Sequence, residues 1–74
     1  MNLEAIAKAY TRSIELEEHA QQDAPALADE TAILRADLHA LLMDALRQAG
    51  IPFADRSDAA RIAFDIALGK RKIA

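Results

Sequence analysis

The feature that most constrains the fold is a periodic apolar pattern that ends at Pro52. Steps of four and three residues alternate along it, through Leu27, Thr31, Leu34, Leu38, Leu41 and Ala45. This spacing draws one narrow stripe along a helix, which helical bundles and coiled coils bury as a seam. Gly50 can take the left-handed conformation that closes a helix, and proline prevents its continuation. The pattern therefore predicts a long helix over residues 25–49 that buries this stripe, widened by Leu42, Leu46 and Ala49.

Two shorter patterns predict further helices on either side of the long one, over residues 3–21 and 57–68. Asn2 is a suitable N-cap for the first of them, and Asp55 or Ser57 can cap the last one. The last helix is apolar over most of its circumference, which is typical of a helix buried between neighbours.

A short polar connection joins the first two helices and ends at Pro25. Proline suits the first turn of a helix, although the helix could start as late as Asp29. Short connections make consecutive helices antiparallel neighbours. The predicted fold is all-α, a long antiparallel helical hairpin plus a short third helix, in a single small domain over residues 1–74.

The first two helices each carry apolar residues away from their main stripes, which a three-helix monomer covers poorly. A chain of 74 residues without cysteines is also only marginally stable alone. Exposed apolar surface marks a partner interface, so we expect a homodimer and, on the same surface, a foreign protein. Acidic residues nearby would steer a basic partner. The candidate interface consists of Leu16, Ile33, Ala36, Ala40, Met43, Glu15, Glu17 and Glu18.

The sequence offers little for catalysis or for metal binding. His19 and His39 are the only imidazoles, and neither has a Glu three residues before it or a second His four residues away, as helical metal sites require. Both are interpreted as solvated or boundary residues. With two glycines and no cysteine, the chain has no phosphate-cradling loop and no thiolate ligand. We therefore expect no catalytic residues, no cofactor, no metal and no enzymatic activity.

The charge of the chain argues against a nucleic-acid partner, because its body is acidic. The net charge is −3, and residues 1–69 carry six basic against twelve acidic side chains. An alternative is a dimeric DNA-binding regulator that uses the third helix and the basic tail, residues 70–74. Its phosphate contacts would be Lys70, Arg71 and Lys72. Against it, the third helix presents two aspartates to the phosphate backbone.

The function that fits these features is that of a small non-enzymatic regulatory or adaptor protein acting through protein–protein interaction. Inhibitors encoded by phages or mobile elements have this general character, and a structural helical oligomer is a further alternative. No stretch reaches the roughly 20 apolar residues of a membrane span, and the start of the chain does not resemble a secretion signal. A cytoplasmic location without membrane contact is expected.

Overall fold

The structure, a computed structural model, describes residues 2–71 and is built from helices. Its elements are α1 (Leu3–Asp23), the short 3₁₀-helix η1 (Pro25–Leu27), α2 (Ala28–Gln48) and α3 (Arg56–Ala67). The described part of the chain contains no strand. The predicted all-α class with three α-helices is confirmed.

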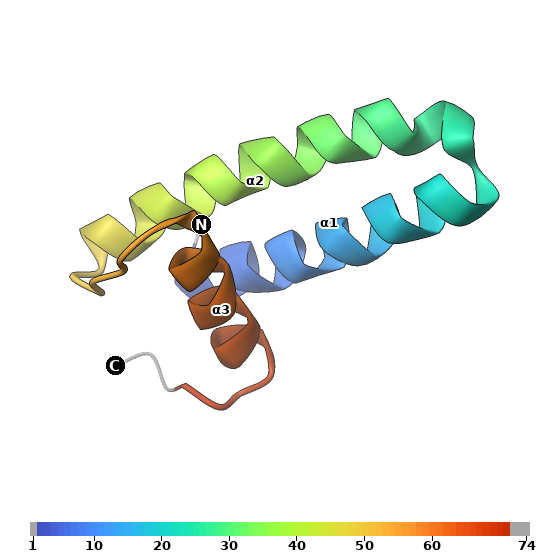
Figure 1. The fold of residues 1–74 in the computed structure, drawn as a ribbon. Helices are drawn as coiled ribbons and strands as arrows, with labels where there is room; N and C mark the ends of the chain where they lie inside the picture. Colours follow the sequence, from blue (N-terminus) through green and yellow to red (C-terminus); the bar gives the residue numbers. More distant parts are fainter. Residues whose placement is uncertain (1, 72–74) are drawn as a thin grey trace.

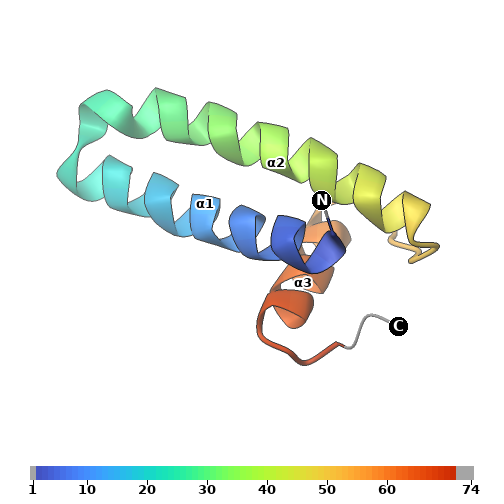
Figure 2. The same ribbon diagram turned by 180° about the vertical axis from the view of Figure 1, so that it is seen from behind.

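α1 and α2 lie side by side and run in opposite directions, whereas α3 crosses them at one end (Figure 1). This end holds the start of α1 and the end of α2. From behind, α1 lies in front of α3, so α3 covers only one face of the α1/α2 pair (Figure 2). The protein is accordingly elongated, with extents of 39 × 22 × 20 Å.

The helix ends follow local signals that the sequence carries. The Ala5 backbone N–H donates to Asn2 Oδ1 at 2.7 Å, and the Asp58 N–H donates to Asp55 Oδ1 at 2.8 Å. Both side chains therefore act as N-caps, as predicted. At the end of α2, Gly50 takes the predicted left-handed conformation with φ of 72°. The Ile51 N–H then donates to the Leu46 carbonyl at 2.9 Å, which closes the helix.

The start of α2 differs in detail from the prediction. Pro25 begins η1 rather than the α-helix, and α2 follows from Ala28 without a side-chain cap. Asp29 lies inside the first turn, where its charge suits the helix dipole.

The hydrophobic core lies where α3 packs against the α1/α2 pair. Its largest fully buried apolar side chains are Leu42, Leu46 and Ile62. Fully buried alanines of α1 and α3 let the helices approach closely. The core cluster is Leu3, Ile6, Ala7, Tyr10, Leu42, Leu46, Ala59, Ile62, Ala63 and Ile66.

The seam predicted for α2 is confirmed in part, because Leu38 and Ala45 of the stripe are half-buried and pack against the core. Leu42 and Leu46 are fully buried, whereas Leu34 and Leu41 of the predicted stripe are about half exposed. The buried row also includes Arg35, which is half-buried, and His39, which is buried. These polar residues occupy positions that face α1 and α3 and find partners there, which apolar periodicity alone does not reveal.

α3 is also less buried than its apolar circumference predicted. Phe64 is 39% exposed, and Leu68, which follows the helix, is 66% exposed. The reason is that α3 contacts the other helices along one side only, through Ala59, Ile62, Ala63 and Ile66.

Candidate protein-interaction surface

Four leucines form an exposed apolar surface on the α1/α2 pair. Leu34 and Leu41 of α2 are 45% and 49% exposed, as is Leu27 at the end of η1 at 49%. Seven residues separate each from the next, about two helical turns, so the three share one side. Leu16 of α1 is 42% exposed. We call this set, Leu16, Leu27, Leu34 and Leu41, the leucine face.

The contacts of α2 place its part of the leucine face on the side away from α3. Arg35 forms an ion pair with Glu17 and so points toward α1. His39 Nε2 lies 3.1 Å from the Arg56 carbonyl and so points toward the start of α3. At about 100° per residue, Leu34 lies on the opposite side of Arg35 from His39. It therefore faces away from α3.

The α1 part of the leucine face lies on the same side. Ala7 is fully buried at the end of α1 that α3 crosses. Leu16 follows it by nine residues, two and a half turns, and so lies opposite to it around the helix. Ala9 and Ala5 lie beside Leu16 on this side, half-buried and exposed respectively. Small side chains on α1 thus lie next to large ones on α2.

Charged residues border the leucine face, with opposite signs on its two edges. On α2 the edge is an exposed acidic row of Glu30, Asp37 and Asp44, again seven residues apart. On α1 the edge carries the exposed cations Lys8 and Arg12. Lys8 pairs with Glu4 at 2.9 Å, whereas Arg12 has no ion-pair partner among residues 2–71.

The candidate interface residues of α2 lie beyond this acidic row. Ile33 is 62% exposed, and Ala36 and Ala40 are exposed beside it. Met43 is half-buried and packs against the core. This strip therefore offers one large exposed side chain, and Leu16 lies apart from it on the leucine face.

The acidic residues proposed to steer a partner do not form one cluster. Glu15 and Glu18 are exposed on α1. Glu17 instead pairs with Arg35 across the helices, and its side chain is only 15% exposed. The Glu17–Arg35 pair contributes to the register of α1 along α2.

His39 is the main residue whose environment the sequence interpretation missed. It is buried rather than solvated, with Nδ1 3.4 Å from the Tyr10 hydroxyl and Nε2 3.1 Å from the Arg56 carbonyl. A carbonyl only accepts, so Nε2 carries the hydrogen and Nδ1 accepts a long hydrogen bond from Tyr10. The two rings also pack edge to face, 5.0 Å apart. One neutral imidazole thus links all three helices.

Burial shifts the titration of both rings toward their neutral forms. It lowers the pKa of His39, with the nearby Arg56 and Arg35 charges acting in the same direction, against the hydrogen bond to the Arg56 carbonyl. It also raises the pKa of Tyr10, against the effect of the two arginines. The pair is therefore a structural contact that is stable at neutral pH.

Several other ionisable groups form pairs on the surface. His19 is exposed and lies 3.2 Å from Asp23 one turn away. On α3, Arg61 bonds both Asp58 and Asp65, at 2.7 and 3.3 Å. Within residues 2–71, no three His, Asp or Glu side chains gather in a way that could hold a metal ion.

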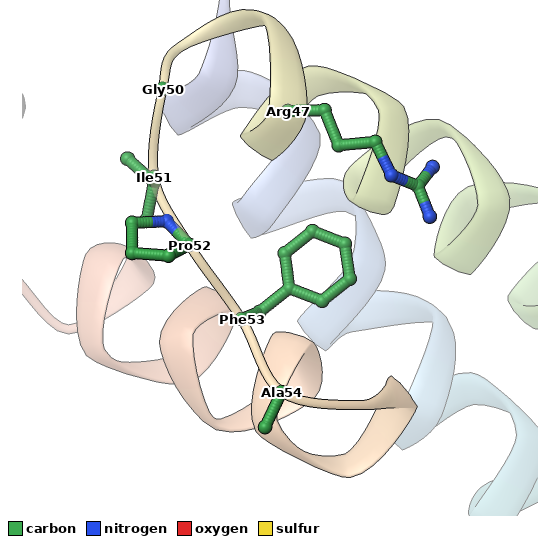
Figure 3. A pocket seen from close by; sticks show the side chains of 6 residues that line it. All are labelled: Arg47, Gly50, Ile51, Pro52, Phe53 and Ala54. Carbon is green, nitrogen blue, oxygen red and sulfur yellow. The ribbon is translucent and has the colours of Figure 1, made fainter.

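A hollow lies at the connection between α2 and α3 (Figure 3). Its volume is about 520 Å³, and its lining contains one charged side chain, Arg47. The guanidinium of Arg47 lies 5.2 Å from the centre of the Phe53 ring, a cation–π contact that fixes the connection. The lining is otherwise backbone and apolar, and it supplies no acid–base pair.

The residues of the DNA-binding alternative are only partly described. Lys70 and Arg71 are exposed beyond the end of α3, and Lys72 lies outside the described residues. Asp58 and Asp65, the two aspartates predicted to repel a phosphate backbone, flank Arg61 on α3.

The signal for the leucine face was present in the sequence but was assigned to the core. Leu27, Leu34 and Leu41 repeat with the same seven-residue period as the neighbouring acidic row. Such a period next to a charged edge is typical of a helix contact, and the exposure of these leucines leaves that contact to a second chain.

In the described part of the chain, no helix combines the length and the apolar character needed to cross a membrane. Comparisons with protein-family models, with curated proteins and with solved structures find no match to this chain.

Proposed function

We propose that this chain is a small non-enzymatic regulatory or adaptor protein that acts through protein–protein interaction. Its first partner is a second copy, bound to the leucine face of the α1/α2 hairpin. The observation that carries the proposal is the exposure of four leucines on a face that α3 leaves open. Apolar side chains gathered in this way mark interaction sites.

The leucine face is a better interface than the Ile33 strip for two reasons. It holds four large apolar side chains, whereas the strip holds one. Its seven-residue period also matches the spacing at which helices pack together over several turns. The Ile33 strip is left as the surface for a foreign partner, whereas Glu15, two residues from Glu17, lies on the side of α1 that faces away from α2.

The non-enzymatic part of the proposal is supported by the roles of the two imidazoles. Both ring nitrogens of His39 are engaged inside the fold. His19 lies on the open surface in a pair with Asp23. General acid–base catalysis needs such groups beside a cleft that binds substrate.

The proposal is tested by a matched pair of substitutions at neighbouring exposed positions, Leu34→Gln and Ile33→Gln. Sedimentation velocity over a range of protein concentrations measures self-association, and circular dichroism checks that each variant is folded. We expect Leu34→Gln to shift the protein toward monomer, because it puts a polar amide into the contact. Ile33→Gln should associate like the unmodified chain.

Two results would contradict the proposal. If the unmodified chain stays monomeric at all concentrations, it does not self-associate, and the proposed dimer is wrong. A loss of association with Ile33→Gln, and not with Leu34→Gln, would move the interface to the Ile33 strip.

A further inference from the structure

The two edges of the leucine face carry charges of opposite sign, and this limits how a second copy can bind. The α2 edge is acidic through Glu30, Asp37 and Asp44. The α1 edge carries Lys8, which is paired with Glu4, and Arg12, which has no ion-pair partner among residues 2–71 and makes the edge basic. A surface that carries both signs on separate edges can be complementary to itself.

Two symmetric arrangements place the leucine faces of two copies together. With the two-fold axis across the helices, α2 packs on α2, and the acidic row of one copy borders that of the other. With the two-fold axis along the helices, α1 of each copy packs on α2 of the other. Only the second arrangement brings the acidic edge of one copy next to the basic edge of the other. It is favoured for this reason, because like charges in close contact destabilise a complex.

We propose that the second copy binds in this second arrangement, as a four-helix contact in which α1 of each copy packs on α2 of the other. The proposal rests on the proposed function, because it requires the leucine face to bind a copy of the chain. Beyond the proposed function, it specifies which helix of the second copy packs on each helix and which residues lie opposite one another.

The register follows from symmetry and from the contacts within one chain. Rotation about an axis parallel to the helices does not change the position of a residue along that axis, so the same residue of both copies lies at the same level. Tyr10 bonds His39 and Glu17 pairs with Arg35, so these residues are level. Arg12, between Tyr10 and Glu17, is then level with residues 37–38 of α2. Arg12 of each copy therefore lies beside Asp37 of the other.

The apolar residues match in the same register. Because α1 and α2 are antiparallel, the Tyr10–His39 and Glu17–Arg35 contacts place Leu16 level with residues 33–36 of α2, a range that includes Leu34. Ala9 is next to Tyr10 and is level with residues 40–41. Leu34 thus meets Leu16 of the second copy, and Leu41 meets Ala9. In the second of these pairs a large side chain of α2 lies over a small side chain of α1, which allows the side chains of the two helices to interdigitate.

A charge-reversal mixture tests this arrangement with the full chain. Arg12→Glu and Asp37→Arg are both substitutions of exposed residues, so each variant should fold, which circular dichroism checks. In a dimer of either variant alone, two like-charge contacts replace two attractive ones. We expect about a tenfold or larger weakening of each homodimer, judged by sedimentation, and less at high salt.

An equimolar mixture of the two variants should restore dimerisation to the level of the unmodified chain. In the mixed dimer both contacts again join opposite charges. As a matched control, Asp29→Arg replaces Asp37→Arg in the mixture. Asp29 is exposed on α2 but lies about 140° around the helix from Leu34. This control mixture should show no preference for the mixed dimer.

The outcomes separate this inference from the proposed function. A monomeric unmodified chain overturns both. A dimer that is unaffected by the reversals, or one that Asp37→Arg alone strengthens, overturns the arrangement and leaves the self-interaction standing. The second result would indicate that α2 packs on α2, where the substitution relieves acidic repulsion.

Discussion

His39 is the residue at which the three helices meet. It accepts from the Tyr10 hydroxyl of α1 and donates to the Arg56 carbonyl at the start of α3. A proton on Nδ1 would remove the acceptor that Tyr10 uses and would bury a charge between Arg35 and Arg56. The neutral ring is thus part of what fixes α3 against the other helices.

This contact predicts a loss of stability in mild acid. Because the pKa of His39 is lower in the folded chain than its ordinary value of 6.5, the unfolded chain binds the proton first. The stabilisation is complete above about pH 6.5 and decreases as the pH falls below that value. Urea unfolding at pH 7.5 and 5.0 should show a lower free energy of unfolding at pH 5.0.

The control for this prediction is His39→Gln, which cannot titrate in this range. Its free energy of unfolding should change much less between the two pH values. Asp58 does not confuse the comparison, because the Ala54 N–H and Arg61 hold its pKa below 3.8. An equal pH dependence in the variant would show that other groups cause the acid effect.

The ends of the elements could be predicted from the sequence, because a helix end depends on a few adjacent residues. Asn2, Asp55 and Gly50 act where they were expected to act. The buried side of α2 could not be predicted in the same way. Leucines are found both in its buried row and on the exposed side next to that row, and which of them are buried depends on the sides that α1 and α3 contact.

A matched pair of neighbouring leucines tests the buried side of α2. Leu42 is fully buried, whereas Leu41 is 49% exposed. Leu42→Ala should lower the free energy of unfolding by about 2–5 kcal/mol, because it leaves a cavity in the core. Leu41→Ala should cost less than about 1 kcal/mol in the monomer, since it removes a side chain that is already half in water.

The measurement is chemical denaturation at low protein concentration, where self-association does not contribute to stability. A larger loss for Leu41→Ala than for Leu42→Ala would show that Leu41, and not Leu42, lies in the core. The same result would remove the leucine face as an exposed surface.

At the scale of the molecule, the third helix decides what is left open. The sequence predicted an all-α chain of three helices, and it also predicted that the third helix is buried between neighbouring helices. In the structure α3 covers one face of the α1/α2 pair and exposes Phe64 and Leu68 on its own outer side. The side on which a short helix docks depends on the geometry of the whole chain, which local periodicity does not contain.

The candidate interface shows the same limit. The sequence indicated that helices one and two carry more apolar surface than one chain can bury, and the structure places Leu16 and Ile33 at the surface. It assigned Leu34 and Leu41 to the core, although the structure exposes them. Arg12 and Asp37 can be recognised as the charged edges of one surface only after the structure places α1 and α2 side by side.

The most direct test of the proposed self-interaction is an isotope-filtered NOE experiment on a mixture of labelled and unlabelled chains, which detects only contacts between copies. We predict intermolecular NOEs from the Leu34 methyls to Leu16 and from the Leu41 methyls to Ala9, with none from Ile33. The absence of intermolecular NOEs from the leucine face at millimolar concentration, or NOEs from Ile33 alone, would contradict the proposal.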